Sequence, residues 1–123
     1  MSAAGQAIIA NAPFSVATGW ILLTVAGVLE IGWAIGMKKA DGFTHLWWSI
    51  LTVTLMIVSM YLLVQATRVL PIGTAYAVWT GIGAVGAATL GIIIYKEPAT
   101  TVRIACIVLI LGGIVGLKLS YRA

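Results

Sequence analysis

Four long apolar runs alternate with three short polar breaks along this chain of 123 residues. The runs cover residues 19–38, 46–67, 72–95 and 103–121, and each break combines basic residues with a glycine or a proline. Backbone groups in lipid are satisfied only within a helix or a closed barrel, so such runs predict helices. Because about 20 apolar residues span a bilayer, the pattern predicts an all-α integral membrane protein with four transmembrane helices.

The fourth run is the weakest of the four, because the stretch between Arg103 and Lys118 is shorter than a full crossing. A lysine can extend its ammonium group towards the lipid headgroups while its aliphatic stem stays in the apolar region. With Leu119 to Tyr121 continuing the helix, we predict that this run also spans the membrane.

The composition excludes an ordinary soluble domain. Of the residues, 62% are hydrophobic and only 8% are charged, and the mean hydropathy is +1.13. The basic residues lie at the ends of the runs rather than on one face, which argues against nucleic-acid binding. Residues 1–18 contain no Lys or Arg, and we predict that they form a loosely ordered extension before a four-helix domain at 19–123.

The seven basic side chains are nearly balanced between the two predicted sides of the membrane. Four helices place both termini and the second loop on one side, with Arg68, Lys118 and Arg122. The positive-inside rule then selects no orientation, which favours insertion in both directions and an antiparallel dimer. The alternative is that the loops are too short for the count to be informative.

The spacing of Gly112 and Gly116 suits close helix approach and predicts a dimer contact on the fourth helix.

Glu30 is the only acidic residue inside an apolar run. A carboxylate near the middle of a membrane is costly unless it is compensated, so it is a candidate functional group by default. No Lys, Arg or His lies in the middle of any run, and the chain itself therefore offers no cationic partner. Glu30 must hold a proton or a cation from outside. The alternative is a protonated structural acid that is bonded to a neighbour.

Aromatic, hydroxyl and small side chains are predicted to surround Glu30 by their helical spacing. Together with a carboxylate, aromatic faces and hydroxyl oxygens suit a desolvated organic cation. Plainer interpretations are aromatic packing, hydroxyls bonded to their own helix, and glycines that allow close packing or bending of the third helix. The candidates are Gly27 and Trp33 on the first helix, Ser59 on the second, and Tyr76, Trp79, Gly83 and Gly86 on the third.

Several kinds of chemistry have no basis in the sequence. It contains no Cys/His cluster, no nucleophile–base pair and no phosphate-binding loop. We therefore predict that the protein is not an enzyme and that it holds neither a metal nor another cofactor. Cys106 is the only cysteine, which excludes an intrachain disulfide.

Two long motifs carry a family resemblance. They are Gly27-Val-Leu-Glu30-Ile-Gly-Trp33-Ala-Ile-Gly-Met-Lys38 and Pro71-Ile-Gly-Thr-Ala-Tyr76-Ala-Val-Trp79-Thr-Gly-Ile-Gly83-Ala-Val-Gly86. With the turn Asp41-Gly-Phe-Thr44 and the segment Gly112-Gly-Ile-Val-Gly-Leu-Lys118, the chain closely resembles the small multidrug resistance family from about Gly19 to Tyr121. Trp33, together with Thr80-Gly-Ile-Gly-Ala-Val-Gly86, is similar to the guanidinium-exporter subtype of this family.

The resemblance implies an antiparallel homodimer in the bacterial inner membrane that exchanges guanidinium-type cations for protons. Glu30 is then the carboxylate shared by proton and substrate, and Trp33 and Ser59 organise it. Tyr76 contacts and gates the substrate, and Trp79 lines the cavity. The implied dimer contact on the fourth helix consists of Gly112, Gly113 and Gly116.

Other functions stay open from the sequence. The nearest alternative is a multidrug exporter of hydrophobic quaternary ammonium cations. A non-transporting membrane assembly subunit is another, in which Glu30 makes only an interhelical hydrogen bond. A lipid-linked sugar flippase is less favoured, because such relatives often lack a carboxylate inside the membrane. The long N-terminal extension departs from the family pattern.

Overall fold

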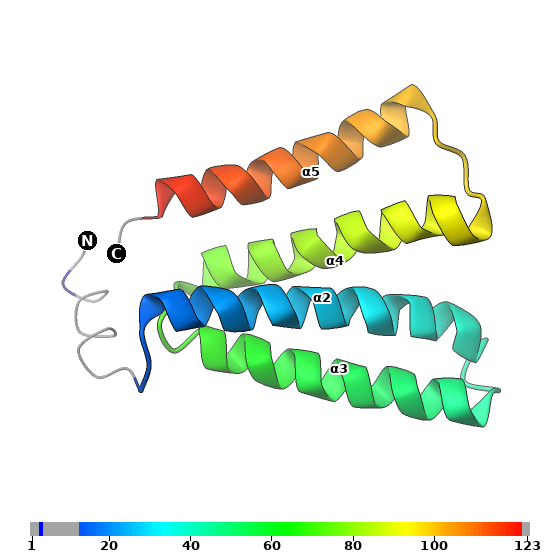
Figure 1. Ribbon diagram of the computed structural model, residues 1–123, viewed down its shortest axis with the longest axis horizontal. Coiled ribbons are helices and arrows are strands. Elements are labelled where there is room, and N and C mark those ends of the chain that lie inside the picture. Colours follow the sequence, from blue (N-terminus) through cyan, green and yellow to red (C-terminus); the bar gives the residue numbers. More distant parts are fainter. Residues whose placement is uncertain (1–2, 4–12, 122–123) are drawn as a thin grey trace.

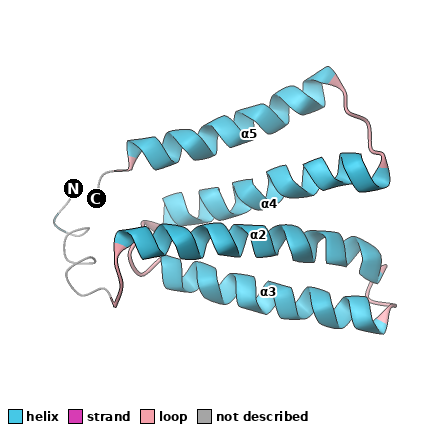
Figure 2. Ribbon diagram, in the orientation of Figure 1, coloured by secondary structure: helices cyan, strands magenta, loops and turns pink. Residues whose placement is uncertain are grey.

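The computed structural model describes residue 3 and residues 13–121, and every regular element within residues 13–121 is an α-helix (Figure 1, Figure 2). All four of these helices are long and apolar enough to cross a membrane. The predicted fold class, an all-α membrane protein with four transmembrane helices per subunit, is confirmed. The bounds are α2 Val16–Ala40, α3 Leu46–Ala66, α4 Ile72–Tyr95 and α5 Thr101–Ser120.

The helix bounds differ from the predicted ones mainly where the first and the last helix begin. α2 begins at Val16, so the end of the predicted 1–18 extension belongs to a helix. Most of that extension lies outside the described residues. α4 has the predicted bounds, and α3 ends at Ala66 rather than at residue 67. α5 begins at Thr101 rather than at residue 103.

Side-chain caps explain the early starts of α2 and α5. The Ser15 hydroxyl accepts a hydrogen bond from the Thr18 N–H at 3.2 Å. The Thr100 hydroxyl accepts one from the Arg103 N–H, also at 3.2 Å. Each bond pairs a backbone donor that the first helical turn leaves without a partner. The cap helps to give α5 a length of 20 residues, or about 30 Å, which is enough for a crossing.

α2 is the central helix of the subunit, because it packs against both α3 and α4 (Figure 1). α2 and α4 run in the same direction, since α3 returns the chain between them. α5 lies outside this group and packs mainly on α4. The buried apolar core is formed by α2, by the end of α3 with the loop after it, and by the first half of α4. None of the residues of α5 is buried.

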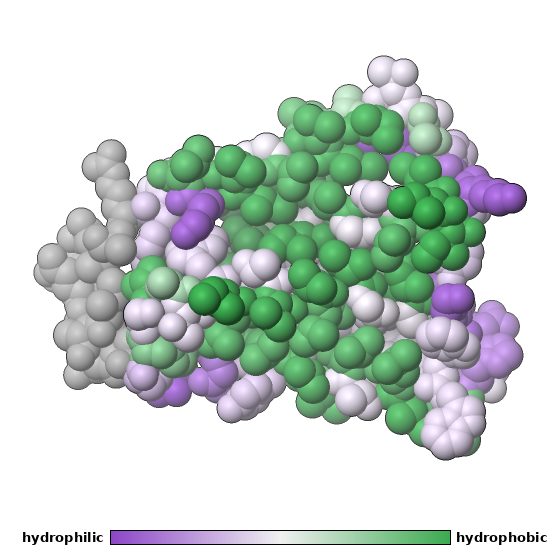
Figure 3. Space-filling model, viewed as in Figure 1, coloured by the Kyte–Doolittle hydropathy of each residue, from purple (hydrophilic) through white to green (hydrophobic). Residues whose placement is uncertain are grey.

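The outer surface is a broad apolar belt with hydrophilic side chains towards two opposite ends (Figure 3). Large apolar side chains such as Ile21, Ile57 and Leu109 are exposed on it. Lipid acyl chains are the solvent that suits such a surface. Near one end, the Lys39 ammonium lies 5.0 Å from the centroid of the Trp48 ring. This pairing is typical of the aromatic belt at a membrane–water boundary.

Candidate functional site

Glu30 lies in the middle of α2 and faces α4 at Gly83. A Cβ atom added to Gly83 would overlap the Glu30 carboxylate, so only a glycine leaves room for this side chain against the α4 backbone. The Oε2 atom of Glu30 is buried and has no hydrogen-bond partner among the described residues. A buried oxygen of this kind is costly to leave unpaired. The site is therefore a carboxylate that is held in place and lacks a donor.

Two further glycines, one on each helix, bring α2 and α4 together around Glu30. A Cβ at Gly27 would come within 2.8 Å of the Ile82 side chain, and a Cβ at Gly86 would overlap the side chain of Ile31. The space beside Gly27 is thus filled by Ile82. We call this contact between α2 and α4, with Gly27, Gly83 and Gly86, the glycine seam.

Ser59 links three helices through two hydrogen bonds. Its hydroxyl donates to the Ala26 carbonyl oxygen at 2.6 Å and accepts from the Trp79 indole N–H at 3.0 Å. A serine hydroxyl has a single hydrogen to donate, so it cannot donate to Glu30 at the same time. Ala26 lies one helical turn before Glu30 on α2. In this structure Ser59 therefore holds the backbone near Glu30 and does not bond to the carboxylate.

The aromatic candidates fall into two places. Trp79 is buried, and its ring lies 5.6 Å from the ring of Tyr76, at an angle of 56°. Tyr76 itself is 54% exposed. Trp33 is half-buried on α2, and its indole N–H has no hydrogen-bond partner among the described residues. The structure thus joins Ser59, Trp79 and Tyr76 in one group and places Glu30 with Gly83 on the glycine seam.

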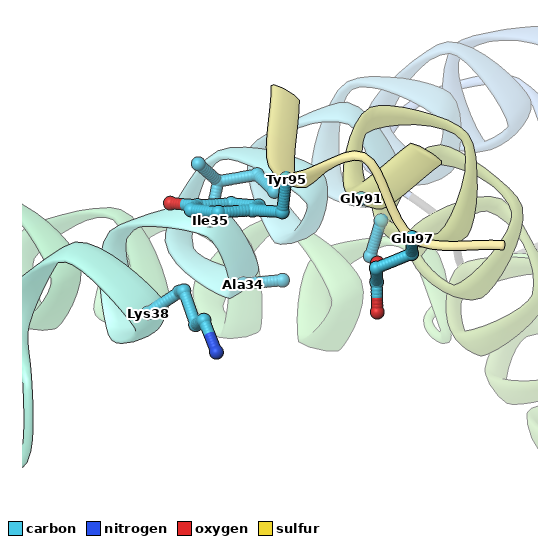
Figure 4. A pocket seen from close by; sticks show the side chains of 7 residues that line it. Ala34, Ile35, Lys38, Gly91, Tyr95 and Glu97 are labelled. Carbon is cyan, nitrogen blue, oxygen red and sulfur yellow. The ribbon is translucent and has the colours of Figure 1, made fainter. Parts of the chain in front are cut away.

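A cavity of about 400 Å³ continues the glycine seam beyond Glu30. Ala34 on α2 and Ala87 on α4 line it, one turn after Glu30 and Gly83 respectively. Figure 4 shows Lys38 from α2 at one side of this cavity and Glu97 at another. Glu97 also forms an ion pair with Arg103, at 3.4 Å between Oε1 and a guanidinium nitrogen. The cavity lies between the buried carboxylate and the charged end of the helices.

Sequence reasoning did not find this cavity, although a signal for it exists. Small residues recur at intervals of four on α4, at Gly83, Ala87 and Gly91, and Ala34 follows Glu30 at the same interval on α2. Residues four apart lie on one helix face. When two such faces meet in parallel, they leave space that larger side chains would fill.

The glycines predicted as a dimer contact lie on the outer face of α5. A Cβ added at Gly112, Gly113 or Gly116 would meet no atom within 4 Å. The half-buried residues of α5, such as Ile114 and Leu117, pack against the core from the other face. These glycines therefore have no packing role within the described part of the subunit.

Metal ligands do not gather in the described part of the chain. Within residues 13–121 there is no group of three His, Cys, Asp or Glu side chains that is placed to hold a metal ion. Cys106 is exposed on α5 and forms no disulfide there.

A comparison with known families now adds to this geometry. The family model described as Small Multidrug Resistance protein matches residues 18–110, about three quarters of the chain. The chain belongs to the small multidrug resistance family. The match includes Glu30 and the aromatic candidates, but it ends before the three glycines on the outer face of α5.

Bacterial members of the family are similar over most of the chain. A protein named guanidinium exporter from Escherichia coli strain K12 is 58% identical over 101 residues. Proteins of the same name from Citrobacter freundii and Salmonella typhimurium strain LT2 are 57% and 54% identical. Each match covers 82% of this chain and 96% of the relative. This chain, with its four apolar helices, is a multi-pass protein of the bacterial inner membrane.

Proposed function

We propose that the protein exports guanidinium-type cations across the inner membrane in exchange for protons, with Glu30 as the site that both ligands share. The names of the similar bacterial proteins support guanidinium as the substrate. The observation that carries the role of Glu30 is its buried Oε2 atom, which lacks a donor. On this proposal the protein is a transporter and not an enzyme.

Guanidinium supplies the hydrogen-bond donors that the Glu30 carboxylate lacks. It is a planar cation with N–H donors in a fork, and it can donate two parallel hydrogen bonds to one carboxylate. Its flat faces can also stack on aromatic rings. We assign this stacking to Trp33, Tyr76 and Trp79. Ser59 supports the site by anchoring the α2 backbone one turn before Glu30.

Proton coupling follows from the cost of an ionised carboxylate inside a membrane. Without a ligand, Glu30 would carry a bare charge through the apolar region, which is unfavourable by several kcal/mol. Either a proton or a guanidinium ion removes that cost. An unloaded transporter is therefore disfavoured from changing its accessible side, and the movements of the two ligands become linked.

The transporter on this proposal is an antiparallel homodimer. A single subunit leaves α5 without a buried residue, and Gly112, Gly113 and Gly116 form an open face on it. Small residues let two membrane helices approach closely. A partner of the same sequence would also supply a second Glu30. The near balance of basic residues between the two sides is compatible with opposite orientations of the subunits.

Transport in proteoliposomes tests the proposal. In vesicles that contain the purified protein, external guanidinium should drive proton movement, recorded as a current on solid-supported membranes. Glu30→Gln should abolish this current, because glutamine cannot ionise. Glu97→Gln, a matched change at an exposed loop carboxylate, should leave most of it. A Glu30→Gln variant that keeps its guanidinium-driven proton flux would exclude Glu30 as the shared site.

Competition between the two ligands gives a second test. Guanidinium binding, measured by calorimetry in detergent, should weaken as the pH falls, because protons then occupy the same carboxylate. Affinity that is independent of pH would exclude a shared site. Absence of cation binding at every pH would instead favour a non-transporting assembly subunit.

Hydrophobic quaternary ammonium ions are the nearest rival substrates. They carry no N–H donor, so they would leave the Glu30 oxygens without a hydrogen bond even when bound. We therefore expect a larger proton flux with guanidinium than with a tetraalkylammonium ion of similar charge. A larger flux with tetraalkylammonium would favour the multidrug function.

A further inference from the structure

An apolar groove of about 260 Å³ runs between α2, α4 and α5, and it shares Ile82 with the glycine seam. Its walls come from Val78 and Ile82 on α4 and from Ile114 and Val115 on α5. Trp20 and Lys118 also line it. The groove lies where α5 is attached to the rest of the subunit, and this is the contact that lacks buried residues on the α5 side.

A lysine is positioned at the groove by aromatic contacts. The Lys118 ammonium lies 4.2 Å from the centroid of the Trp20 ring. The Tyr121 ring makes an edge contact with the Trp20 ring, with 5.7 Å between the two ring centroids. The indole N–H of Trp20 is buried and has no hydrogen-bond partner among the described residues. The polar end of the groove therefore offers a positioned cation.

No acidic side chain of the chain lies at this end of the helices. The chain has three acidic residues, which are Glu30, Asp41 and Glu97. Asp41 ends α2 and Glu97 follows α4, both at the opposite end from Lys118, which lies where α5 finishes beside the start of α2 (Figure 1). Glu30 lies in the middle of α2 and faces Gly83. None of the three acidic side chains of the chain therefore neutralises Lys118 at the groove.

The walls of the groove indicate which molecule carries an anion to Lys118. Val78 and Ile82 are one helical turn apart, and Ile114 lies one turn before Lys118 on α5. The apolar surface therefore leads from the ammonium group towards the middle of the helices. A free inorganic anion would leave these walls uncovered in the membrane. A lipid with an anionic headgroup satisfies both parts, because its phosphate meets the lysine and its acyl chain covers the walls.

We propose that this groove is a binding site for one anionic phospholipid, with its phosphate on Lys118 and an acyl chain along α4 and α5. The bound lipid contacts α2 through Trp20 and α5 through Ile114 and Val115. It thereby adds apolar contact to α5, a helix that has no buried residue in the subunit. The site is separate from Glu30 and does not depend on the transported substrate.

Lipid retention tests this site on the full-length protein. Native mass spectrometry after release from neutral detergent should show more retained phosphatidylglycerol than phosphatidylcholine. Lys118→Gln should reduce phosphatidylglycerol retention about five-fold, the effect expected for one basic residue at an anionic lipid surface. Lys38→Gln is the matched control. The Lys38 ammonium also lies near an aromatic ring, at 5.7 Å from the centroid of Tyr95, but Lys38 shares its cavity with the acidic residue Glu97. This variant should leave retention unchanged.

The proposal would be overturned if the two lysine variants lost phosphatidylglycerol equally. It would also be overturned if the unaltered protein retained phosphatidylglycerol and phosphatidylcholine equally. Circular dichroism shows whether each variant is folded before the comparison is made. A phosphatidylglycerol with a photoreactive acyl chain gives a second measurement. It should cross-link to the α5 peptide that contains Ile114 and Val115. Absence of cross-links there would overturn the lipid site in favour of a groove covered by a second copy of the chain.

Discussion

Glycines play opposite parts in two regions of this molecule. In the glycine seam, Gly27, Gly83 and Gly86 are covered by side chains of the facing helix, and an added Cβ would collide at each position. On α5, Gly112 and Gly116 have the same kind of small-residue spacing, but nothing lies within 4 Å of an added Cβ. The same residue type therefore closes a contact in one region and leaves a face open in the other.

This difference shows that the subunit uses glycines for close packing between α2 and α4 but not for the attachment of α5. Membrane helices associate through close van der Waals contact, and glycines permit the closest approach. Between α2 and α4 that approach is used to hold the carboxylate of Glu30 against the α4 backbone. α5 is attached by larger side chains, such as Ile114 against Gly81, and its own glycines face away. A rigid site and an available outer face thus occupy different helices.

The largest expected effect comes from filling the seam at Glu30. Gly83→Ala should cost about 1–3 kcal/mol in the free energy of unfolding, because the new methyl group overlaps the carboxylate. Transport should fall as well, because the new methyl group forces the Glu30 carboxylate away from its place against α4. The free energy is measured by titration with sodium dodecyl sulfate, and transport in proteoliposomes. Gly73→Ala is the control on the same helix, because nothing lies within 4 Å of its added Cβ. Equal effects at the two glycines would contradict the seam.

The open glycine face should respond in the opposite way. Gly113→Leu should leave the secondary structure of the subunit unchanged, because the side chain points into open space. It should weaken dimerisation about ten-fold if this face is the dimer contact, corresponding to about 1.4 kcal/mol of lost close approach. Förster transfer between labelled subunits in vesicles measures the equilibrium. Leu111→Ala is a control on the same helix, because Leu111 is exposed but lies on a different helix face from these glycines. Unchanged dimerisation in Gly113→Leu would place the contact elsewhere.

A smaller effect is expected where the seam is supported from α3. Ser59→Ala removes the bond to the Ala26 carbonyl and leaves the Trp79 N–H buried without an acceptor. Hydrogen bonds between membrane helices contribute about 0.6 kcal/mol on average and up to about 1.7 kcal/mol, and we expect a loss midway between these two values. The same detergent titration measures it.

Ser49→Ala is the matched control for Ser59→Ala, since the Ser49 hydroxyl bonds only to the His45 carbonyl of its own segment. If Ser49→Ala lowered the free energy of unfolding as much as Ser59→Ala, the hydrogen bonds of Ser59 between helices would not be the source of its stabilising effect. If Ser59→Ala also shifts the apparent affinity for guanidinium, the support of α2 reaches the binding site.

The smallest effect concerns the start of α5. Thr100→Ala removes the cap on the Arg103 N–H and should cost about 1 kcal/mol or less. The change should appear as faster hydrogen exchange in the first turn of α5, measured by mass spectrometry. Exchange in α4 should stay the same. Protection that is unchanged at both places would mean that the cap does not set the start of the helix.

Much of the fold could be predicted from the sequence, for a simple reason. In lipid the backbone must satisfy its own hydrogen bonds, so apolar runs of sufficient length become helices whatever their neighbours are. α4 even has the predicted bounds. The starts of α2 and α5 were placed too late, because Ser15 and Thr100 act as caps. Ser15 was counted as part of the N-terminal extension, and Thr100 as part of the third polar break.

The candidate site was less predictable. Helical spacing placed Gly83 among the candidates around Glu30, and the structure brings these two residues into contact. The partners of Ser59 did not follow, since a hydroxyl on α3 has several carbonyls and side chains within its range. Nor did the sequence show that Ile82 fills the space beside Gly27. Which side chain enters a gap depends on the register between helices, and local patterns do not contain that register.

By itself, the sequence determined the helical class, the membrane location and the choice of Glu30 as the candidate site, because these depend on transfer between water and lipid, residue by residue. Only the tertiary structure decided which glycines are covered and which are open, where Ser59 donates its hydrogen, and that Lys118 lies over Trp20 beside an apolar groove. These features arise from contacts between residues far apart in the chain. They depend on how the helices are positioned against one another, which no single helix specifies.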